Sequence, residues 1–215
     1  YTRIAAFCYL LLMLVYMAGW QRLLKVYSTR RTEMPMLSIV VAMRNEAANI
    51  EKLLRALAKQ SYPANKIQVV LVDDHSTDDT AAVVRAAGAG IGSLRIIDSA
   101  PLPDGWAGKC WACWQGAQAA QGEWLLFLDA DVEPAPNLVA ALVRAAQHTH
   151  ADLVTLMPLL HLGSIAERLV LPAFVTILLG LFPLHHVSNP ASALAFANGQ
   201  CIFISRRAYR ATDGH

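Results

Sequence analysis

The chain has 215 residues, which fits one domain of ordinary size together with some additional sequence. Hydrophobic residues make up 55% and charged residues 16%, an apolar excess over soluble domains that points to a membrane. The net charge of +2 and the absence of a long basic run argue against a nucleic-acid partner. Cys110 and Cys113 lack the second pair or the spaced histidines of a zinc site, so we expect them to pack in a helix.

Residues 4–20 form an almost unbroken apolar run without a charge, close to the roughly 20 residues that span a bilayer. Four basic residues follow between positions 22 and 31, which places that flank in the cytoplasm. A cleaved signal peptide would carry its basic residues before the apolar run, so we expect an uncleaved anchor in the inner cell membrane. The expected organisation is a transmembrane anchor over 1–22, a basic cytoplasmic linker over 23–36, and a globular domain facing the cytoplasm over 37–215.

Strand and helix patterns alternate through the next part of the chain. Apolar, β-branched runs predict buried strands over 37–43, 67–72, 94–97, 124–128 and 152–157. Helical spacing predicts helices between these strands, including 108–120 and 137–148, and Asn45 is a candidate cap for the first of them. This alternation predicts an α/β fold with a mostly parallel sheet and helices on both faces.

A long apolar segment over 165–187 interrupts the alternation. Two prolines and a glycine inside it favour a broken helix over a straight spanning one. We expect an insertion over 163–189 that lies in the membrane interface, and a helical hairpin buried in the core is the alternative. A strand pattern resumes at 198–205, and arginines follow at 206, 207 and 210.

Two carboxylates, Asp129 and Asp131, come directly after the apolar strand 124–128. Open α/β sheets bind their ligands at the carboxyl ends of such strands. Carboxylates this close repel each other unless a cation lies beside them, and Mg²⁺ or Mn²⁺ shared with a diphosphate meets that need. An ordinary helix-capping loop is the alternative interpretation of this tripeptide.

Polar side chains also follow the first two predicted strands. Arg44 and Glu46 follow the first strand, and Asp73 and Asp74 follow the second. A parallel sheet brings these ends to one edge, where carboxylates can accept hydrogen bonds from ribose hydroxyls or a base N–H. Lys109 can offset phosphate charge there. Neither a P-loop nor a G-x-G-x-x-G turn is present, which disfavours nucleotide triphosphatases and dinucleotide enzymes.

At these residues the sequence resembles the family 2 glycosyltransferases, which have the GT-A fold. The segments that carry the resemblance are SIVVAMRNE (38–46), VDDHSTD (72–78), Gly108-Lys109, Asp129-Ala130-Asp131 and Asn198-Gly199-Gln200. Within the family, the N-terminal anchor, PDGWAGK (103–109) and the apolar insertion look most like the hopene-associated glycosyltransferases.

The resemblance implies a nucleotide-sugar donor, expected to be a UDP-sugar, and transfer with inversion at the anomeric carbon. It implies donor contacts by Arg44, Glu46, Asp73, Asp74, Lys109 and Asp129. Asp131, together with Asp129, would bind a divalent cation, Mg²⁺ or Mn²⁺. Asn198, Gly199 and Gln200 would lie on the acceptor side, and Trp106 is a candidate to stack on a base or sugar.

An inverting transfer also needs a general base. In the family this is usually an Asp in an acidic motif well after the Asn-Gly-Gln-like segment, and Asp213 stands where many relatives have glycine. We therefore expect the base beyond His215, the chain to be part of a longer protein, and the GT-A domain over 37–215 to be incomplete at its C-terminus.

The expected function is a membrane-anchored, metal-dependent inverting glycosyltransferase that moves a sugar to a lipid acceptor of hopanoid type. Two alternatives remain open at this point. One keeps the fold and changes the acceptor to a polyprenyl phosphate or a polysaccharide. The other is a membrane scaffold that binds nucleotide sugars without catalysis.

Overall fold

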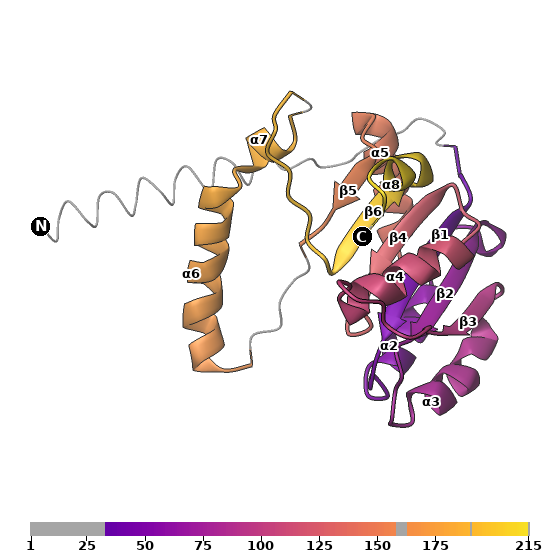
Figure 1. Ribbon diagram of the computed structural model, residues 1–215. Helices are drawn as coiled ribbons and strands as arrows, with labels where there is room; N and C mark the ends of the chain where they lie inside the picture. The colour runs from indigo at the N-terminus through magenta and orange to yellow at the C-terminus, as the bar shows by residue number, and fades with distance from the viewer. Residues whose placement is uncertain (1–32, 158–162, 190, 215) are drawn as a thin grey trace, which may run out of the picture. The chain divides into compact units, whose positions relative to one another are not determined.

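The computed structural model describes residues 33–157, 163–189 and 191–214 (Figure 1). The expected anchor over 1–22 and most of the expected linker lie outside these residues, so both stay predictions. Within the part of the chain that is described, none of the helices combines the length and the apolar character needed to cross a bilayer.

The described residues form one six-stranded sheet with the strand order β3-β2-β1-β4-β6-β5. Its strands are β1 (Leu37–Met43), β2 (Ile67–Asp73), β3 (Leu94–Asp98), β4 (Trp124–Leu128), β5 (Leu153–Thr155) and β6 (Cys201–Ser205). The strands β1 to β4 are parallel to one another, whereas β6 runs antiparallel to both β4 and β5. The prediction of a mostly parallel sheet is confirmed, and the antiparallel insertion of β6 is a feature that the strand–helix alternation did not indicate.

The central strand β1 pairs with β2 on one side and β4 on the other, and its two faces are buried under the helices that cover the sheet. Ile39 and Val41 face one apolar cluster, and Val40 faces the other. Alternate side chains of a strand point to opposite faces, so a strand covered on both sides must be apolar at successive positions. Burial of each such side chain contributes about 1.5–3 kcal/mol to the transfer free energy of folding.

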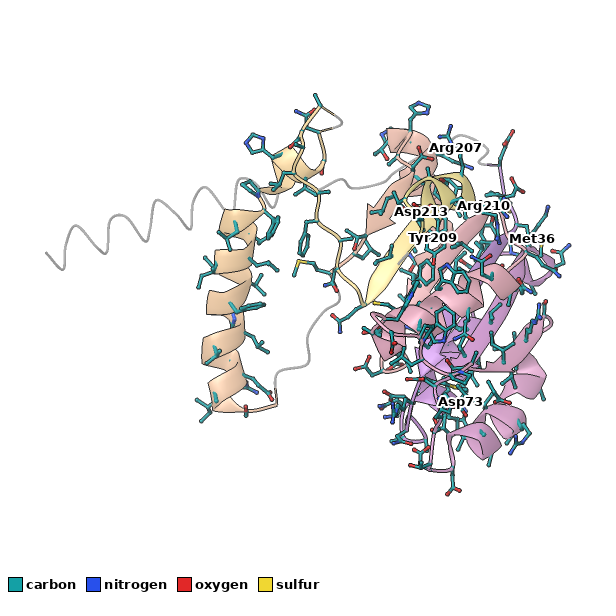
Figure 2. All side chains as sticks on the ribbon, viewed as in Figure 1. Met36, Asp73, Arg207, Tyr209, Arg210 and Asp213 are labelled. Atoms are coloured by element: carbon teal, nitrogen blue, oxygen red, sulfur yellow. The ribbon has the colours of Figure 1, made fainter. Side chains whose placement is uncertain are left out.

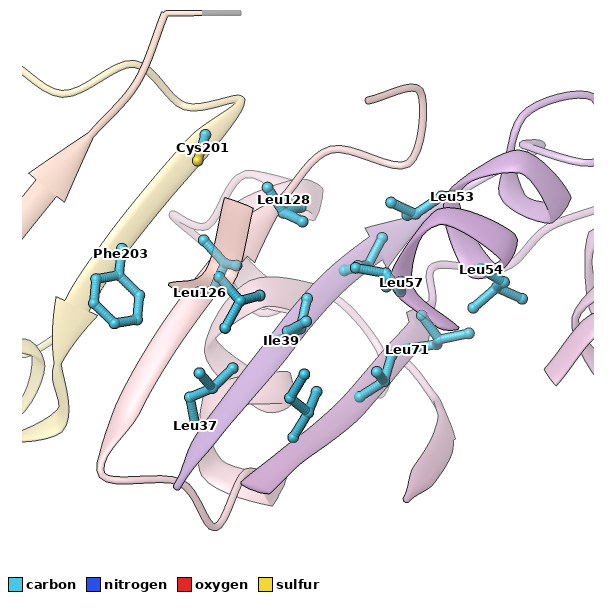
Figure 3. Close-up of a cluster of buried hydrophobic side chains, with 14 of the residues drawn as sticks. Leu37, Ile39, Leu53, Leu54, Leu57, Leu71, Leu126, Leu128, Cys201 and Phe203 are labelled. Atoms are coloured by element: carbon cyan, nitrogen blue, oxygen red, sulfur yellow. The ribbon is translucent and has the colours of Figure 1, made fainter. Parts of the chain in front are cut away.

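Helices cover both faces of the sheet. The helices that pack on it are α2 (Ile50–Ala58), α3 (Thr80–Ala87), α4 (Gly108–Ala119), α5 (Leu138–Thr149) and α8 (Arg206–Ala211). The first face packs against α2, α3 and α5, and Leu53, Leu57 and Phe203 belong to its core (Figure 3). The second face packs against α4 and α8 through small side chains and Tyr209. The expected covering of both faces is therefore confirmed.

Helix α4 approaches the sheet closely because it carries a glycine where it crosses β1 and β2. A Cβ atom at Gly116 would lie 2.4 Å from Val40 Cγ1 and 3.0 Å from Val72 Cγ2. On the same helix the thiol of Cys113 is buried, and that burial raises its pKa to about 12. A thiol in this environment is protonated and unreactive, which agrees with the expected packing role of this cysteine.

The apolar insertion folds into α6 (Ile165–Leu181) and the short α7 (Leu184–Val187). The expected break falls at residues 182–183, and α6 continues through Pro172. A proline inside a helix removes one backbone N–H donor, so α6 loses a single hydrogen bond of its ladder at Pro172. Ser164 and Glu167 form a capping box at the start of α6, in which each side chain accepts from the other residue's backbone N–H.

The two ends of the sheet carry different polar groups. Asp73 marks the end of β2, where β1 and β4 also end, and Arg207 and Arg210 lie at the other end, after β6 (Figure 2). This separation follows from the antiparallel register, which pairs Ser205 with Trp124 at the start of β4. The arginines on α8 are therefore remote from the strand ends that carry the predicted site.

Candidate active site

A pocket of about 450 Å³ opens at the carboxyl ends of β1, β2 and β4. Its walls come from the loops after these three strands and from the first turn of α4. The lining residues are Ala42, Met43, Arg44, Glu46, Asp74, Gly108, Lys109, Asp129, Ala130 and Asp131. A parallel sheet gathers its strand ends at one edge, so residues far apart in sequence meet here.

Six of the predicted site residues line this pocket. They are Arg44, Glu46, Asp74, Lys109, Asp129 and Asp131. Asp73 does not line it, because its side chain turns back into the loop after β2. Its Oδ1 accepts a hydrogen bond from the Ser76 backbone N–H at 2.9 Å. Asp73 thus orders this loop, and its predicted contact with the nucleoside stays a prediction.

The loops after β1 and β2 are joined by reciprocal hydrogen bonds. The Asn45 backbone N–H donates to Ser76 Oγ at 3.0 Å, and the Thr77 backbone N–H donates to Asn45 Oδ1 at 2.8 Å. Both Asn45 and His75 have a left-handed backbone, with φ of 57° and 58°. The prediction that Asn45 caps the first helix is wrong, because its side chain is used by the neighbouring loop and Asn49 takes the N-cap position.

Glu46 is held at the pocket wall from both its backbone and its side chain. Its N–H donates to Thr80 Oγ1 at 2.8 Å, and its carboxylate accepts from Asn49 Nδ2 at 2.9 Å. Asp78 supports the same junction by accepting from the N–H of Ala47 at 3.2 Å and from the Thr80 hydroxyl. The Thr80 hydroxyl is the main reason that the pKa of Asp78 lies below its ordinary value. Sequence reasoning did not identify Thr80 or its role, because the contact joins residues 34 positions apart.

The charges in the pocket form two cation–carboxylate pairs and leave an acidic excess. Lys109 Nζ lies 2.6 Å from Asp129 Oδ1, and Arg44 Nη1 lies 3.7 Å from Asp74 Oδ2. Glu46 and Asp131 add two further carboxylates to the lining. Four carboxylates against two cations leave two formal negative charges, the charge that a divalent cation would balance.

The residues that could hold such a cation are Asp129 and Asp131. In the described ranges, no group of three or more His, Cys, Asp or Glu side chains is arranged to bind a metal ion without help. Two carboxylates still fit Mg²⁺ or Mn²⁺, because these ions take their remaining oxygen ligands from water and substrate phosphates. The donor set therefore fits a metal that binds together with a diphosphate.

The N-terminus of α4 faces the same pocket through Gly108 and Lys109. Ala107 occupies the N-cap position with extended backbone angles, φ of −86° and ψ of 139°, and no side chain caps the helix. The first N–H groups of a helix carry partial positive charge and bind anions such as phosphate. This helix start therefore adds backbone donors to the cationic side of the pocket.

The predicted acceptor-side segment lies next to Asp129 but does not line the pocket. The Asn198 N–H donates to Thr155 Oγ1 at 2.9 Å, and the Gln200 N–H donates to Asn198 Oδ1 at 3.0 Å. The Asp129 N–H in turn donates to the Gln200 carbonyl at 3.3 Å. Residues 198–200 thus form a turn before β6, which begins at Cys201 rather than at the expected position 198.

Three tryptophans pack together beside the start of α4. The ring centroid of Trp111 lies 5.2 Å from that of Trp106 and 5.0 Å from that of Trp114. Trp111 also donates its indole N–H to the Ala100 carbonyl at 3.0 Å, which ties the loop before α4 to the helix. Trp106 is outside the pocket lining and packs edge-on against Trp111, so its predicted stacking on a ligand stays a prediction.

Comparison with known proteins agrees with the resemblance. Residues 38–211 match the family described as Glycosyl transferase family 2. A 4,4'-diaponeurosporenoate glycosyltransferase from Staphylococcus haemolyticus is 34% identical over 97 residues, which are 45% of this chain and 24% of that protein. The chain thus covers about a quarter of the length of this relative.

Two solved structures are similar to this chain in fold. One is the mannosyltransferase PcManGT from Pyrobaculum calidifontis in complex with GDP-Man and Mn²⁺, with a TM-score of 0.65 and 23% identity over 94% of this chain and 54% of that one. The other is S. aureus TarS 1-349 in complex with UDP-GlcNAc, with a TM-score of 0.50 and 25% identity over 60% of this chain and 36% of that one. This similarity shows that the chain has the GT-A fold of glycosyltransferases.

Proposed function

Because the chain belongs to glycosyl transferase family 2, we propose that it binds a UDP-sugar and takes part in inverting transfer of the sugar to a lipid acceptor. The observation that carries this proposal is the pocket at the strand ends. It brings together, from four separate segments, the carboxylates, the two cations and the helix start that a nucleotide sugar needs. The resemblance of the sequence to the family favours UDP as the nucleotide, and of the two similar structures one contains UDP-GlcNAc and the other GDP-Man.

Each wall of the pocket has a part in this proposal. Glu46 and Asp74 accept hydrogen bonds from the nucleoside, and the hydrogen bonds around Thr80 hold Glu46 in place. Lys109 and the first N–H groups of α4 bind the diphosphate. Asp129 and Asp131 would hold a divalent cation, which would supply positive charge beside the leaving diphosphate. Asn198, Gly199 and Gln200 border the acceptor beside Asp129.

The proposed lipid acceptor rests on α6 and on one relative. Val170, Phe174, Ile177 and Leu181 are each more than half exposed, at 57–66%, and their spacing puts them on one face of the helix. Large apolar side chains in such a stripe fit a membrane interface, where α6 can receive an apolar molecule. The relative from S. haemolyticus is named for a lipid-like acceptor, 4,4'-diaponeurosporenoate.

The proposed location is the inner cell membrane, with the catalytic domain in the cytoplasm. The apolar run over residues 4–20 and the basic residues after it support an anchor of this orientation. The insertion over 163–189 would then lie at the surface of the same membrane. Acceptors of hopanoid type fit this arrangement, since they reside in the bilayer from which α6 would receive them.

Calorimetric titration of the purified, detergent-solubilised chain tests the donor site. We expect UDP to bind in the presence of Mn²⁺, GDP to bind more weakly, and binding to disappear in Asp131→Ala. Asp98→Ala is the matched control, because Asp98 ends β3 at the same edge of the sheet but does not line the pocket. Absence of UDP binding with and without Mn²⁺ would contradict the proposed donor.

A sugar-transfer assay on the full-length protein separates catalysis from a scaffold role. Asp131→Ala should abolish transfer of the sugar to lipid extracted from the native membrane, whereas Asp98→Ala should not. Retained function of the Asp131→Ala protein in cells would favour the scaffold.

A further inference from the structure

The carboxylate that a metal would use is already paired with a cation of this chain. Lys109 Nζ lies 2.6 Å from Asp129 Oδ1, within the distance of a charge-assisted hydrogen bond. The side chain of Asp129 is 20% exposed, so this pair is only partly screened by water. Among the described residues no other basic side chain forms an ion pair with Asp129.

The two members of this pair differ in their freedom to move. Asp129 follows a buried strand, and its backbone N–H donates to the Gln200 carbonyl at 3.3 Å. Lys109 lies at the start of α4, a helix that is held against the sheet at Gly116. The side chain of Lys109 is 59% exposed. A lysine ammonium on a flexible four-carbon stem can change partners within a pocket at little cost. The backbone that carries the carboxylate is thus held in place, and the ammonium can leave it.

Lys109 has two candidate partners, the Asp129 carboxylate of this chain and the diphosphate of a ligand. Before any ligand binds, the nearest negative group is Asp129. A diphosphate in the pocket would bring more negative charge to the start of α4, where Lys109 is the second residue. A divalent cation on Asp129 would repel the ammonium from its present position. Metal and diphosphate therefore act on Lys109 in the same direction.

We propose that Lys109 holds the Asp129 carboxylate in place of the metal until the donor arrives, and then moves to the diphosphate so that metal and nucleotide bind with positive coupling. This inference rests on the proposed function for the diphosphate, but the pairing of Lys109 with Asp129 does not. Coupling of this kind is reciprocal, so the nucleotide raises the affinity for the metal by the factor by which the metal raises the affinity for the nucleotide.

Titration of the chain with Mn²⁺ alone tests whether Lys109 competes with the metal for Asp129. Electron paramagnetic resonance monitors the free ion. Lys109→Met should bind Mn²⁺ roughly fivefold more tightly than the unchanged chain, because a partly exposed ion pair of up to about 1 kcal/mol no longer competes. Lys109→Arg keeps the charge and should bind Mn²⁺ as weakly as the unchanged chain. Absence of tighter binding in Lys109→Met would overturn the proposal.

Arg44→Met is the matched control for a general charge effect. It also removes one positive charge from the pocket lining, but Arg44 is paired with Asp74 at 3.7 Å and not with Asp129. We expect Arg44→Met to change the affinity for Mn²⁺ alone by less than about twofold. An equal gain in Arg44→Met and Lys109→Met would show that the pocket's charge, and not the Lys109–Asp129 pair, controls the metal, which would also overturn the proposal.

The same titration with saturating UDP tests whether Lys109 moves from Asp129 to the diphosphate. UDP should tighten Mn²⁺ binding to the unchanged chain, and the factor should be smaller in Lys109→Met, since its Asp129 is free from the start. An equal factor in the two proteins would overturn the exchange of partners. If UDP binds to neither protein, the proposed donor fails, while the titrations with Mn²⁺ alone still decide whether Lys109 competes for Asp129.

Discussion

Helices α4 and α6 are both rich in apolar residues, yet they use these residues in opposite ways. On α4 the residues that meet the sheet are small, and Ala112, Gly116 and Ala117 are buried against β1 and β2. On α6 the large side chains of Val170, Phe174 and Ile177 are exposed. Small residues let a helix approach a sheet closely, whereas large exposed residues form an apolar surface that can contact a membrane. In this pair of helices, the small buried residues of α4 let its start lie at the pocket, whereas the large exposed residues of α6 offer an apolar surface.

The largest expected effect concerns the exposed stripe of α6. In a chain that begins at residue 32 and so lacks the expected anchor, the double substitution Phe174→Ser and Ile177→Ser should weaken binding to lipid vesicles by on the order of a hundredfold, since each side chain contributes about 1.5 kcal/mol or more on leaving water. The free energy of unfolding should change by less than about 0.5 kcal/mol, because both side chains are exposed.

Vesicle co-sedimentation and urea unfolding measure these two quantities. Phe174→Leu is the control, because it keeps an apolar side chain and should still bind vesicles. A large loss of stability together with unchanged vesicle binding would mean that the stripe packs within the protein.

The second prediction tests the close packing of α4. Gly116→Val should lower the free energy of unfolding by about 1–3 kcal/mol, because its Cβ would meet Val40 and Val72. Urea unfolding measures the loss. Gly92→Ala is the matched control, since a Cβ there meets no atom within 4 Å. If Gly116→Val leaves stability unchanged, α4 does not approach the sheet as described.

The third prediction concerns the starts of the two helices, of which α6 has a capping box and α4 has no side-chain cap. Ala107→Ser should stabilise the fold by about 0.5–1 kcal/mol, because the backbone at this position already suits a capping serine. The same change should weaken UDP binding, because the serine hydroxyl would accept a hydrogen bond from a backbone N–H that we propose binds the diphosphate. Urea unfolding and calorimetry measure both effects, and tighter UDP binding would contradict the assignment of this helix start.

The smallest expected effect is a pH dependence confined to α6. Hydrogen bonds from the backbone N–H groups of Ser164 and Gly163 lower the pKa of Glu167. A lowered folded-state pKa means that the capping contribution is fully present above the ordinary carboxyl pKa of about 4.3, and is lost as pH falls through the folded-state value. Amides in the first turn of α6 should therefore exchange faster at acidic pH, after correction for intrinsic rates.

Glu167→Gln should remove this pH dependence. The first turn of α5 contains no acidic residue and no side-chain cap, and it should show no corresponding change. Equal acid sensitivity of the two helix starts in hydrogen exchange would show that a global change, and not the capping box, is responsible.

Much of the fold followed from local sequence patterns. The first strand has the predicted bounds, and the helices around Gly116 and Leu142 end within a residue of their predicted positions. The strand–helix alternation also implied that Glu46, Asp74 and Asp129 would share one edge, and all three line the pocket. These predictions succeed because apolar periodicity reports which side chains are buried, and a parallel sheet leaves little choice for where its strand ends meet.

Only the tertiary structure decided how these polar groups are used. It turned Asp73 into its own loop, placed Asn45 on the loop after β2 instead of on a helix, and paired Lys109 with Asp129. It also inserted β6 antiparallel beside β4, which removed the arginines of α8 from the site. The Asp73 hydrogen bond spans only three residues, but the other outcomes depend on contacts between segments far apart in the chain, which sequence patterns of near neighbours do not determine.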